Sequence, residues 1–246
     1  MARLILVPTP LGNLEDITLR ALRLFKEATL IYAEDTRTTG SLLKHYDIKK
    51  SILPYHLHNE HKMVATIVER IKQEEFVLLV SDAGTPSISD PGFLLVRACI
   101  EAGITVECLP GPSALIPAIV GSGLACDRFV FEGFLPHKKG RQTKVALLAE
   151  EERTVVLYES PHRILKCLQQ FMEVCGPNRR ACVVREISKF YETFHRGTLS
   201  ELVSYFEATP AKGEIVFLLE GKAIVPKDKS ISNASKYASK FNDEEE

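Results

Sequence analysis

Short apolar runs alternate with stretches of helical period along this chain, and that alternation limits the folds open to it. Five runs rich in Val, Ile and Leu are apolar on successive residues, as in strands covered on both faces. They occupy residues 3–7, 29–33, 51–55, 76–80 and 105–109. Helical patterns follow at residues 16–28, 37–45, 59–73, 91–102 and 112–120. Repeated strand–helix units predict an α/β fold, here a parallel sheet with helices on both faces.

A break of small residues, GSGLACD, divides the chain into two parts. We predict an N-terminal α/β domain over residues 1–120, a linker at 121–127 and a C-terminal domain over 128–221. The second part has strand-like runs at 128–134, 154–160, 181–187, 192–198 and 214–221, with helical patterns near 138–151, 162–174 and 199–207. The third and fourth of these runs are typical of antiparallel neighbours, so a mixed sheet is expected. Residues 222–246 are polar and are expected to form a mobile tail.

Length and composition exclude several classes of protein. A chain of 246 residues can bury a core large enough to fold without disulfides. Its six cysteines include no C-x-x-C pair, so we expect buried free thiols in a reducing compartment rather than a zinc site. We find neither a signal peptide nor a run of about 20 apolar residues that could span a membrane. A soluble cytoplasmic protein is expected, and the net charge of −1 argues against a generally basic nucleic-acid coat.

Several common ligand-binding motifs are missing. The first strand runs into PTPLGNLED, which has one glycine where a dinucleotide fingerprint needs three. The P-loop and the G-x-S-x-G elbow are also absent from the sequence. Three histidines and Glu60 lie within residues 56–61, but their spacing does not match H-E-x-x-H. We therefore predict no metal site.

Polar loops follow the predicted strands, at the position where open α/β sheets bind ligands. The stretch SDAGTPSISDPG, residues 81–92, is the most unusual of them. Gly84 would let a ligand lie against the backbone, and Pro86 stiffens the loop. Because the loop has no phosphate-binding lysine, a ligand with amine, hydroxyl and cationic parts fits it better than a triphosphate. Asp90 followed by Pro91 is typical of a helix start with Asp90 as the N-cap.

Three other polar segments have two readings each. EDTRTTG, residues 34–40, is either a substrate-facing wall or a helix cap with a surface pair of Asp35 and Arg37. YESPHR, residues 158–163, repeats that arrangement after another strand. HKKGRQTK, residues 137–144, places four cations within eight residues, which suits either phosphate contact or a solvated helix start.

Eight motifs occur in a fixed order over residues 3–221. They are PTPLGNLEDIT, AEDTR, HNE, SDAGTPSISDPG, PGPSA, YESPHR, REISKFYE and GEIV. In this order they resemble the ribosomal RNA small-subunit methyltransferase I family of the tetrapyrrole (corrin/porphyrin) methylase superfamily. The resemblance implies two α/β domains, usually in a homodimer, with S-adenosylmethionine folded into the cleft between them. It also implies methylation of the ribose 2′-hydroxyl of a cytidine in the 16S rRNA decoding centre, on the small ribosomal subunit.

Carried over motif by motif, the resemblance assigns roles to residues of this chain. Those expected to bind the cofactor are Leu11, Asp82, Gly84, Thr85, Ile88, Ser113, Ala114, Tyr158, Glu214 and Ile215. Asp82 either orients its loop or faces the substrate. Those expected to face the RNA are Arg37, Arg163, Lys189 and Tyr191, together with Lys138, Lys139 and Arg141 of the basic segment 137–144. Some members of the family have a longer C-terminal extension than the polar segment 222–246 expected here. We therefore expect the basic segment 137–144 to be the RNA-docking surface of this chain.

Methyl transfer from a sulfonium needs mainly an oxygen aligned with the S–CH₃ bond. Because a ribose hydroxyl is a poor nucleophile, a base that accepts its proton would help. The candidates are Glu34, Asp35, Glu159 and His162, and Asp35 is preferred because Arg37 could hold it ionised and oriented. Two other functions stay open, a methylase of small tetrapyrroles and a non-catalytic ribosome-binding factor that retains the fold.

Overall fold

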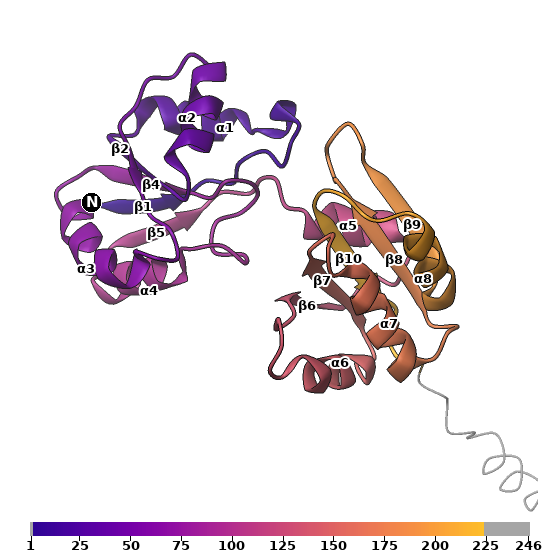
Figure 1. Cartoon of the computed structure of the whole chain (residues 1–246). Helices are drawn as coiled ribbons and strands as arrows, with labels where there is room; N and C mark the ends of the chain where they lie inside the picture. The colour runs from indigo at the N-terminus through magenta and orange to yellow at the C-terminus, as the bar shows by residue number, and fades with distance from the viewer. Residues whose placement is uncertain (1, 224–246) are drawn as a thin grey trace, which may run out of the picture.

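The structure, a computed structural model, describes residues 2–223 and consists of two α/β lobes (Figure 1). We call residues 2–109 the first lobe and residues 114–223 the second lobe. Nearly all of the tail predicted at 222–246 lies outside the described residues. Each lobe is built on its own five-stranded sheet, which confirms the predicted α/β class with two sheets.

The sheet of the first lobe is parallel throughout, as predicted. Its strands are β1 (Arg3–Leu6), β2 (Leu30–Ala33), β3 (Ile52–Pro54), β4 (Phe76–Val80) and β5 (Thr105–Cys108), in the order β3-β2-β4-β1-β5. The three central strands are buried almost completely, whereas β3 and β5 are partly exposed. The expectation that all five strands are covered on both faces is therefore wrong for the two at the edges of the sheet.

Helices cover both faces of this sheet. One face packs against α1 and α2, and the other packs against α3 and α4. Successive strand residues point to opposite faces, so Val77 joins the α3–α4 side and Leu78 the α1–α2 side. The elements are η1 (Leu14–Asp16), α1 (Leu19–Glu27), α2 (Thr36–His45), α3 (Glu60–Ile71) and α4 (Phe93–Glu101).

The sheet of the second lobe is mixed, as predicted. Its strands are β6 (Phe129–Phe134), β7 (Thr154–Glu159), β8 (Arg180–Arg185), β9 (Thr193–Thr198) and β10 (Ile215–Leu219), in the order β6-β7-β10-β8-β9. Strands β8 and β9 form the expected antiparallel pair, and only β6 and β7 are parallel. The helices are α5 (Leu115–Ser122), α6 (Arg141–Ala149), α7 (Ile164–Cys175) and α8 (Leu199–Ala208).

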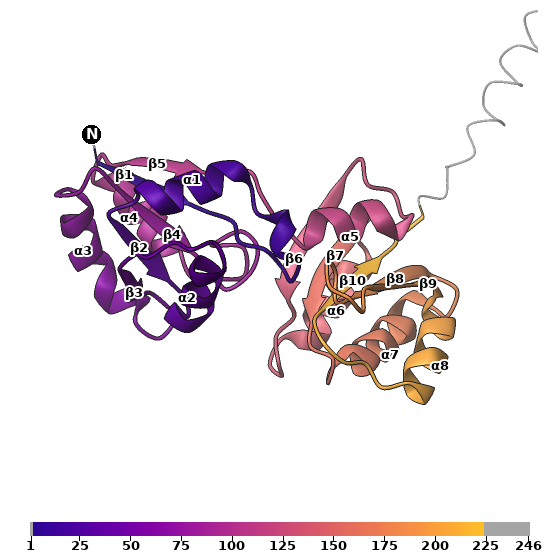
Figure 2. The same ribbon diagram turned by 90° about the horizontal axis from the view of Figure 1, so that it is seen from above.

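Helix α5 corrects the predicted domain boundary. Helices α6, α7 and α8 pack on one face of the second sheet, and α5 packs on the other. Ala118 and Ile119 of α5 share a buried cluster with Val156, Cys182 and Val216, and both ribbon views place α5 with the second lobe (Figure 1, Figure 2). The chain therefore crosses between the lobes at 109–114, before α5, and not at 121–127. The apolar pattern of a helix shows that it is buried, but it does not show against which of two sheets the helix packs.

Two further predictions, on membrane spans and on the burial of the cysteines, can be compared with the described residues. Across residues 2–223 no helix is both long and apolar enough to cross a membrane. The six cysteines are free, but only Cys99, Cys167 and Cys182 are buried, while Cys108 and Cys126 are exposed. The expectation of buried thiols therefore holds for half of them.

Candidate functional site

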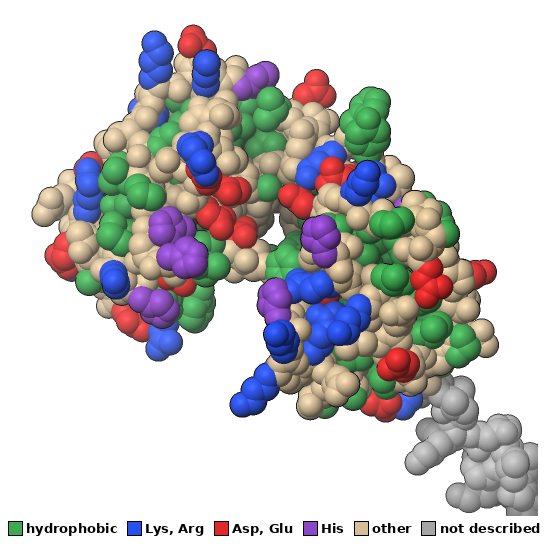
Figure 3. All heavy atoms as spheres, in the orientation of Figure 1, with side chains coloured by type: hydrophobic (Ala, Val, Ile, Leu, Met, Phe, Trp, Pro, Cys, Tyr) green, Lys and Arg blue, Asp and Glu red, His purple; other side chains and the backbone are tan. Residues whose placement is uncertain are grey.

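A cavity of about 410 Å³ lies where loops of the two lobes meet. The space-filling view shows the molecule hollowed between the lobes (Figure 3). All ten residues predicted to bind the cofactor line this cavity: Leu11, Asp82, Gly84, Thr85, Ile88, Ser113, Ala114, Tyr158, Glu214 and Ile215. The structure thus brings together residues from five separate motifs, and their contact with a cofactor stays a prediction. A larger, more open hollow of about 790 Å³ at 127–129 and 150–153 contains none of the predicted loops.

Strand register explains why these loops converge. Leu6 at the end of β1 is paired with Leu79 of β4 and with Cys108 of β5, so three loops leave the sheet side by side. The carboxyl ends of parallel strands form the ligand-binding edge of open α/β sheets. The second lobe closes the cavity with the end of β7 and the segment that leads into β10.

The loop between β4 and α4, residues 81–92, has an unusual backbone. Gly84 and Gly92 have φ angles of 79° and 147°, and Ser87 and Ser89 have φ angles of 74° and 64°. A left-handed conformation in a residue other than glycine is uncommon and costs about 1–3 kcal/mol. Strain of this kind is concentrated at functional sites, where surrounding contacts maintain it.

Hydrogen bonds to neighbouring loops hold this backbone in place. Gly84 and Thr9 exchange two backbone hydrogen bonds, of 2.9 and 2.8 Å. Thr85 Oγ1 donates to the carbonyl of Pro112 at 3.2 Å. The left-handed φ of Gly84 explains the glycine by itself, because an added Cβ would still meet Leu11 Cδ2 at an ordinary 3.4 Å. The predicted reason for this glycine, close approach of a ligand, is therefore not the only one.

Asp90 is not the N-cap of the following helix, which corrects the sequence-based interpretation. Helix α4 begins at Phe93, and its N-cap position is Gly92, which makes no side-chain capping bond. A capping oxygen must come from the residue directly before the first helical one, and Asp90 lies two positions too early. The turn at Ser87–Ser89 instead directs Asp90 into the cavity lining, where Glu34 and Asp82 also lie.

Three carboxyl groups in this cavity have raised pKa values. Burial raises the pKa of Asp90 to about 7, and the negative charges of Glu34 and Asp82 add to the effect while the Ser81 hydroxyl opposes it. Burial and the charge of Asp82 raise the pKa of Glu34, and burial raises the pKa of Asp82. Perturbed acids grouped in one cleft are typical of functional sites. Sequence reasoning missed Asp90 because its helix-start pattern explained it without a site.

The preferred base, Asp35, lies outside the cavity lining. Its carboxylate accepts the backbone N–H of Arg37 at 2.8 Å and pairs with the Arg37 guanidinium at 2.6 Å. The hydrogen bonds from Arg37 lower the pKa of Asp35 to about 2, which makes it a weak base. The structure therefore supports the alternative reading, a helix cap with a surface ion pair. His162 is also exposed and outside the lining.

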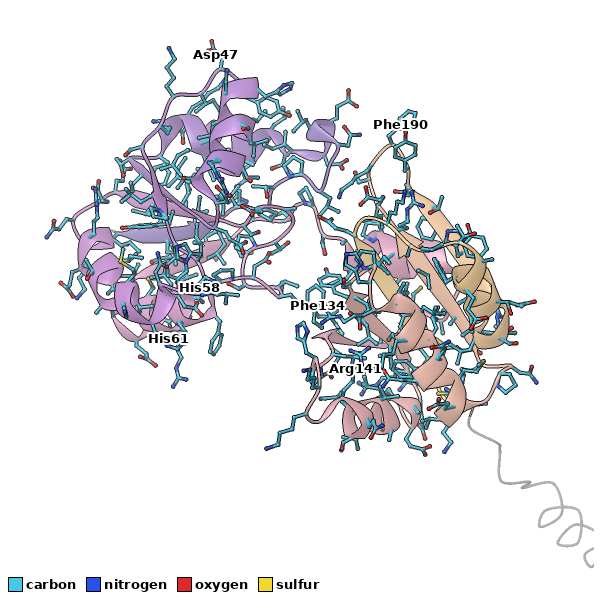
Figure 4. All side chains as sticks on the ribbon, in the orientation of Figure 1. Asp47, His58, His61, Phe134, Arg141 and Phe190 are labelled. Atoms are coloured by element: carbon cyan, nitrogen blue, oxygen red, sulfur yellow. The ribbon has the colours of Figure 1, made fainter. Side chains whose placement is uncertain are left out.

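Glu159 belongs to a buried ionic network. It accepts from Arg141 Nη2 at 2.8 Å and from Arg163 Nε at 2.8 Å, and its side chain is 1% exposed. Arg141 is 6% exposed, so its predicted role in RNA docking is wrong (Figure 4). Arg163, at 24%, remains partly accessible. With both oxygens bound to guanidinium groups, Glu159 organises the cavity wall and is poorly placed to accept a proton.

The other predicted RNA-facing residues come from separate segments, and none of them lines the cavity. Lys138 and Lys139 are exposed, and lysine and arginine side chains gather on the side of the second lobe that faces the first (Figure 3). Arg37 is 89% exposed, but it is paired with Asp35. Lys189 bridges Glu186 and Glu214, each at 3.1 Å, which limits its freedom to bind phosphate.

Two exposed aromatic residues were absent from the predicted set. Phe190 is 93% exposed at the end of the β8–β9 hairpin and packs edge-on against the predicted Tyr191, which is 65% exposed (Figure 4). Phe134 is 53% exposed and lines the cavity beside Tyr158, with ring centroids 5.7 Å apart. Phe134 ends the strand-like run predicted at 128–134, so the sequence presents it as a core residue, whereas Phe190 lies in the motif REISKFYE between two residues already expected at the RNA. No group of three or more His, Cys, Asp or Glu within 2–223 is arranged to hold a metal.

Residues 3–203 match the family model of the Tetrapyrrole (Corrin/Porphyrin) Methylases. The ribosomal RNA small subunit methyltransferase I of Haemophilus influenzae is 50% identical over 222 residues, 89% of this chain and 78% of that protein. Its counterpart from Thermotoga maritima is 46% identical over 222 residues, 90% of this chain and 100% of that protein. The chain belongs to the ribosomal RNA small subunit methyltransferase I family. Membership confirms the resemblance and makes the chain a methyltransferase.

Solved structures confirm the two-lobe fold of this family. Uroporphyrin-III C-methyl transferase from Thermus thermophilus, complexed with S-adenyl homocysteine, has a TM-score of 0.64 at 20% identity, covering 89% of this chain and 97% of that one. A diphthine synthase has a TM-score of 0.69 at 17% identity, covering 90% of this chain and 91% of that one. At these identities the likeness shows the fold alone.

Proposed function

We propose that this chain methylates the ribose 2′-hydroxyl of a cytidine in 16S rRNA, on the small ribosomal subunit, with S-adenosylmethionine as methyl donor. The observation that carries the proposal is the cavity between the lobes, which collects all ten residues expected at the cofactor. The names of the similar proteins support the rRNA substrate. The 2′-oxygen and the cytidine come from the motif resemblance.

The cavity suits such a cofactor in size and chemistry. Its volume of about 410 Å³ lies within the usual range for a small-molecule site, roughly 300–1,000 Å³. Leu11, Ile88 and Ala114 offer apolar surface, while carboxylates of Glu34 and Asp82 suit cationic and hydroxyl groups. When bound, the cofactor would supply a methyl group already activated by its positive sulfur. The protein then has to bind, orient and manage one proton.

The RNA would meet the rim of the cavity. Exposed Lys138 and Lys139 can contact phosphates, which position an RNA without reading its sequence. The exposed pair of Phe190 and Tyr191 can stack on unpaired bases, the usual way in which proteins hold single-stranded RNA. The homodimer implied by the resemblance is part of this proposal, and light scattering of the purified protein tests it.

The deciding experiment is transfer of labelled methyl groups from S-adenosylmethionine to small subunits that lack the modification. We expect label in 16S rRNA, recovered as 2′-O-methylcytidine after nuclease digestion. Free 16S rRNA, protein-only reactions and a small tetrapyrrole serve as controls. Label in a base, in protein or in the tetrapyrrole would overturn the proposal, and no transfer at all would favour a non-catalytic ribosome-binding role.

A further inference from the structure

We propose that Asp90 is the proton acceptor of the methyl transfer and that the loop at residues 81–92 is bent in order to hold it in the cavity. This inference rests on the proposed function, because it assigns one step of that reaction. Asp90 lines the cavity together with the residues expected at the cofactor. It was not among the candidate bases that the sequence suggested.

The loop conformation that places Asp90 in the cavity lowers the stability of the fold, which indicates that the placement serves a function. Ser87 and Ser89 both adopt left-handed backbone conformations just before it. Ser87 Oγ is buried and has no hydrogen-bond partner among residues 2–223. Both features are destabilising, and a loop that only connected a strand to a helix would need neither. Ser89 Oγ also packs towards Gly133 of β6, where an added Cβ would lie 3.0 Å away, so the bend fits against the second lobe.

The groups facing Asp90 give it no counter-ion. Glu34 after β2, Asp82 after β4 and Glu214 before β10 are the charged groups that act on it most strongly, and all are acids. The other neighbours are uncharged, the hydroxyl of Ser81 and the phenol of Tyr158 on β7, whose pKa of about 12 keeps it protonated. A base surrounded by acids binds a proton more readily than one beside cations.

Three carboxylates in or beside the cavity are paired with cations, whereas Glu34, Asp82 and Asp90 form no ion pair within residues 2–223. Asp35 is bound to Arg37, Glu159 to Arg141 and Arg163, and Glu214 to Lys189. A general base works best when its pKa lies near the working pH, and the value of about 7 for Asp90 meets that condition.

The step balances without any further reactant. Asp90, as the carboxylate, accepts the proton of the ribose hydroxyl while the oxygen forms its bond to the methyl carbon. The C–S bond breaks and its electron pair stays on sulfur, so the positive sulfonium becomes a neutral thioether. The carboxylate becomes a neutral carboxylic acid, which returns its proton to solvent before the next turnover.

The test compares Asp90→Asn, Glu34→Gln and Asp47→Asn. Asp47 is exposed, far from the cavity, and has a φ of 55° that asparagine also tolerates, so it is the matched control for an Asp-to-Asn change (Figure 4). We expect Asp90→Asn to lower the single-turnover rate at least about 100-fold, within the range typical of removing a general base. Its affinity for S-adenosylhomocysteine in calorimetry should stay within about threefold of wild type, because the cofactor is held mainly by other groups.

Dependence on pH separates a base from a structural residue. The wild-type rate should rise with pH to a plateau with a midpoint near 7, since Asp90 must be ionised. Glu34→Gln removes the charge that raises this pKa most after burial, so its midpoint should fall, whereas Asp47→Asn should leave the midpoint unchanged. The ¹³C resonance of the Asp90 carboxyl in the free protein, assigned by its disappearance in Asp90→Asn, should titrate with the same midpoint.

The outcomes separate this inference from the proposed function. Wild-type protein that methylates rRNA together with a fully active Asp90→Asn would overturn the role of Asp90 and leave the function standing. A tenfold or larger loss of S-adenosylhomocysteine affinity in Asp90→Asn would make Asp90 a cofactor-binding residue and also overturn it. Titration of the Asp90 carboxyl below pH 5 in the free protein would do the same, even if no substrate were found.

Discussion

Replacing Glu159 by alanine should destabilise the second lobe far more than removing an exposed ion pair. The carboxylate of Glu159 joins Arg141 of α6 and Arg163, just before α7, to the end of β7. Arg163 is 24% exposed and can turn towards water when its partner is removed. Arg141 is 6% exposed and cannot, so the substitution leaves a buried positive charge without its counter-ion.

The size of the effect follows from the hydrogen bonds that remain. Removing one partner of a buried ion pair costs roughly 3–5 kcal/mol. Arg141 would keep hydrogen bonds to Gln170 Oε1 at 2.8 Å and to the carbonyl of Pro136 at 3.3 Å. We therefore expect the lower end of that range, about 3 kcal/mol, out of the roughly 5–15 kcal/mol that stabilise a typical domain. The double variant Glu159→Leu with Arg141→Met should be destabilised less, because it leaves no unpaired charge in the interior.

Guanidinium unfolding followed by circular dichroism measures the change, since the chain has no tryptophan for fluorescence. Glu101→Ala is the matched control, because it breaks the Arg97–Glu101 pair, whose side chains are 67% and 64% exposed. Such surface pairs contribute about 0–1 kcal/mol. If Glu159→Ala cost no more than Glu101→Ala, or the double variant cost more than the single one, the buried-charge reasoning would be refuted.

Three further predictions concern the cavity and its rim. Gly84→Val should abolish S-adenosylmethionine binding in calorimetry with unchanged circular dichroism, because a β-branched residue is strained at a φ of 79°; unchanged affinity would contradict the loop assignment. Lys138→Glu with Lys139→Glu should weaken small-subunit binding and flatten its salt dependence, by about 0.7–0.9 in log–log slope for each phosphate that is no longer neutralised, and an unaltered slope would move the RNA surface elsewhere. The pKa of Asp90 is about 7 in the folded protein and about 4 in the unfolded chain. Its contribution to the free energy of unfolding is therefore fully present below about pH 4 and is lost as the pH rises through about 7. Asp90→Asn should therefore raise the unfolding midpoint relative to wild type at pH 8 but not at pH 4, and equal differences at both pH values would refute the raised pKa.

Strand and helix positions were predictable because burial imposes a local pattern. The run predicted at 154–160 is β7 at Thr154–Glu159, and the helix predicted at 162–174 is α7 at Ile164–Cys175. A strand covered on both faces needs apolar residues at successive positions, and a helix that covers a sheet needs them every three or four. These requirements act over a few neighbouring residues, so they can be read without knowing the fold.

Partners across the chain were not predictable in the same way. Arg141 was placed in a solvent-facing basic segment because its neighbours Lys138 and Lys139 are cations, yet its guanidinium lies against Glu159, 18 positions away. Asp35 was preferred as a base for the sake of Arg37, and the same ion pair lowers its pKa to about 2. Whether a charged residue is buried with a counter-ion depends on which elements pack together.

The sequence by itself determined the two α/β halves, the polar loops at their strand ends and the family to which they belong. Periodicity and motif order are patterns along the sequence, so they can be recognised without knowing how the chain folds. Only the tertiary structure decided that α5 covers the second sheet and that Glu159 is committed to two arginines. It also showed that Asp90 is not a helix cap but lines the cavity, where burial raises the pKa of its carboxyl group to about 7. Burial and counter-ions are set by segments far apart in the chain, and they decide which carboxylate can accept a proton.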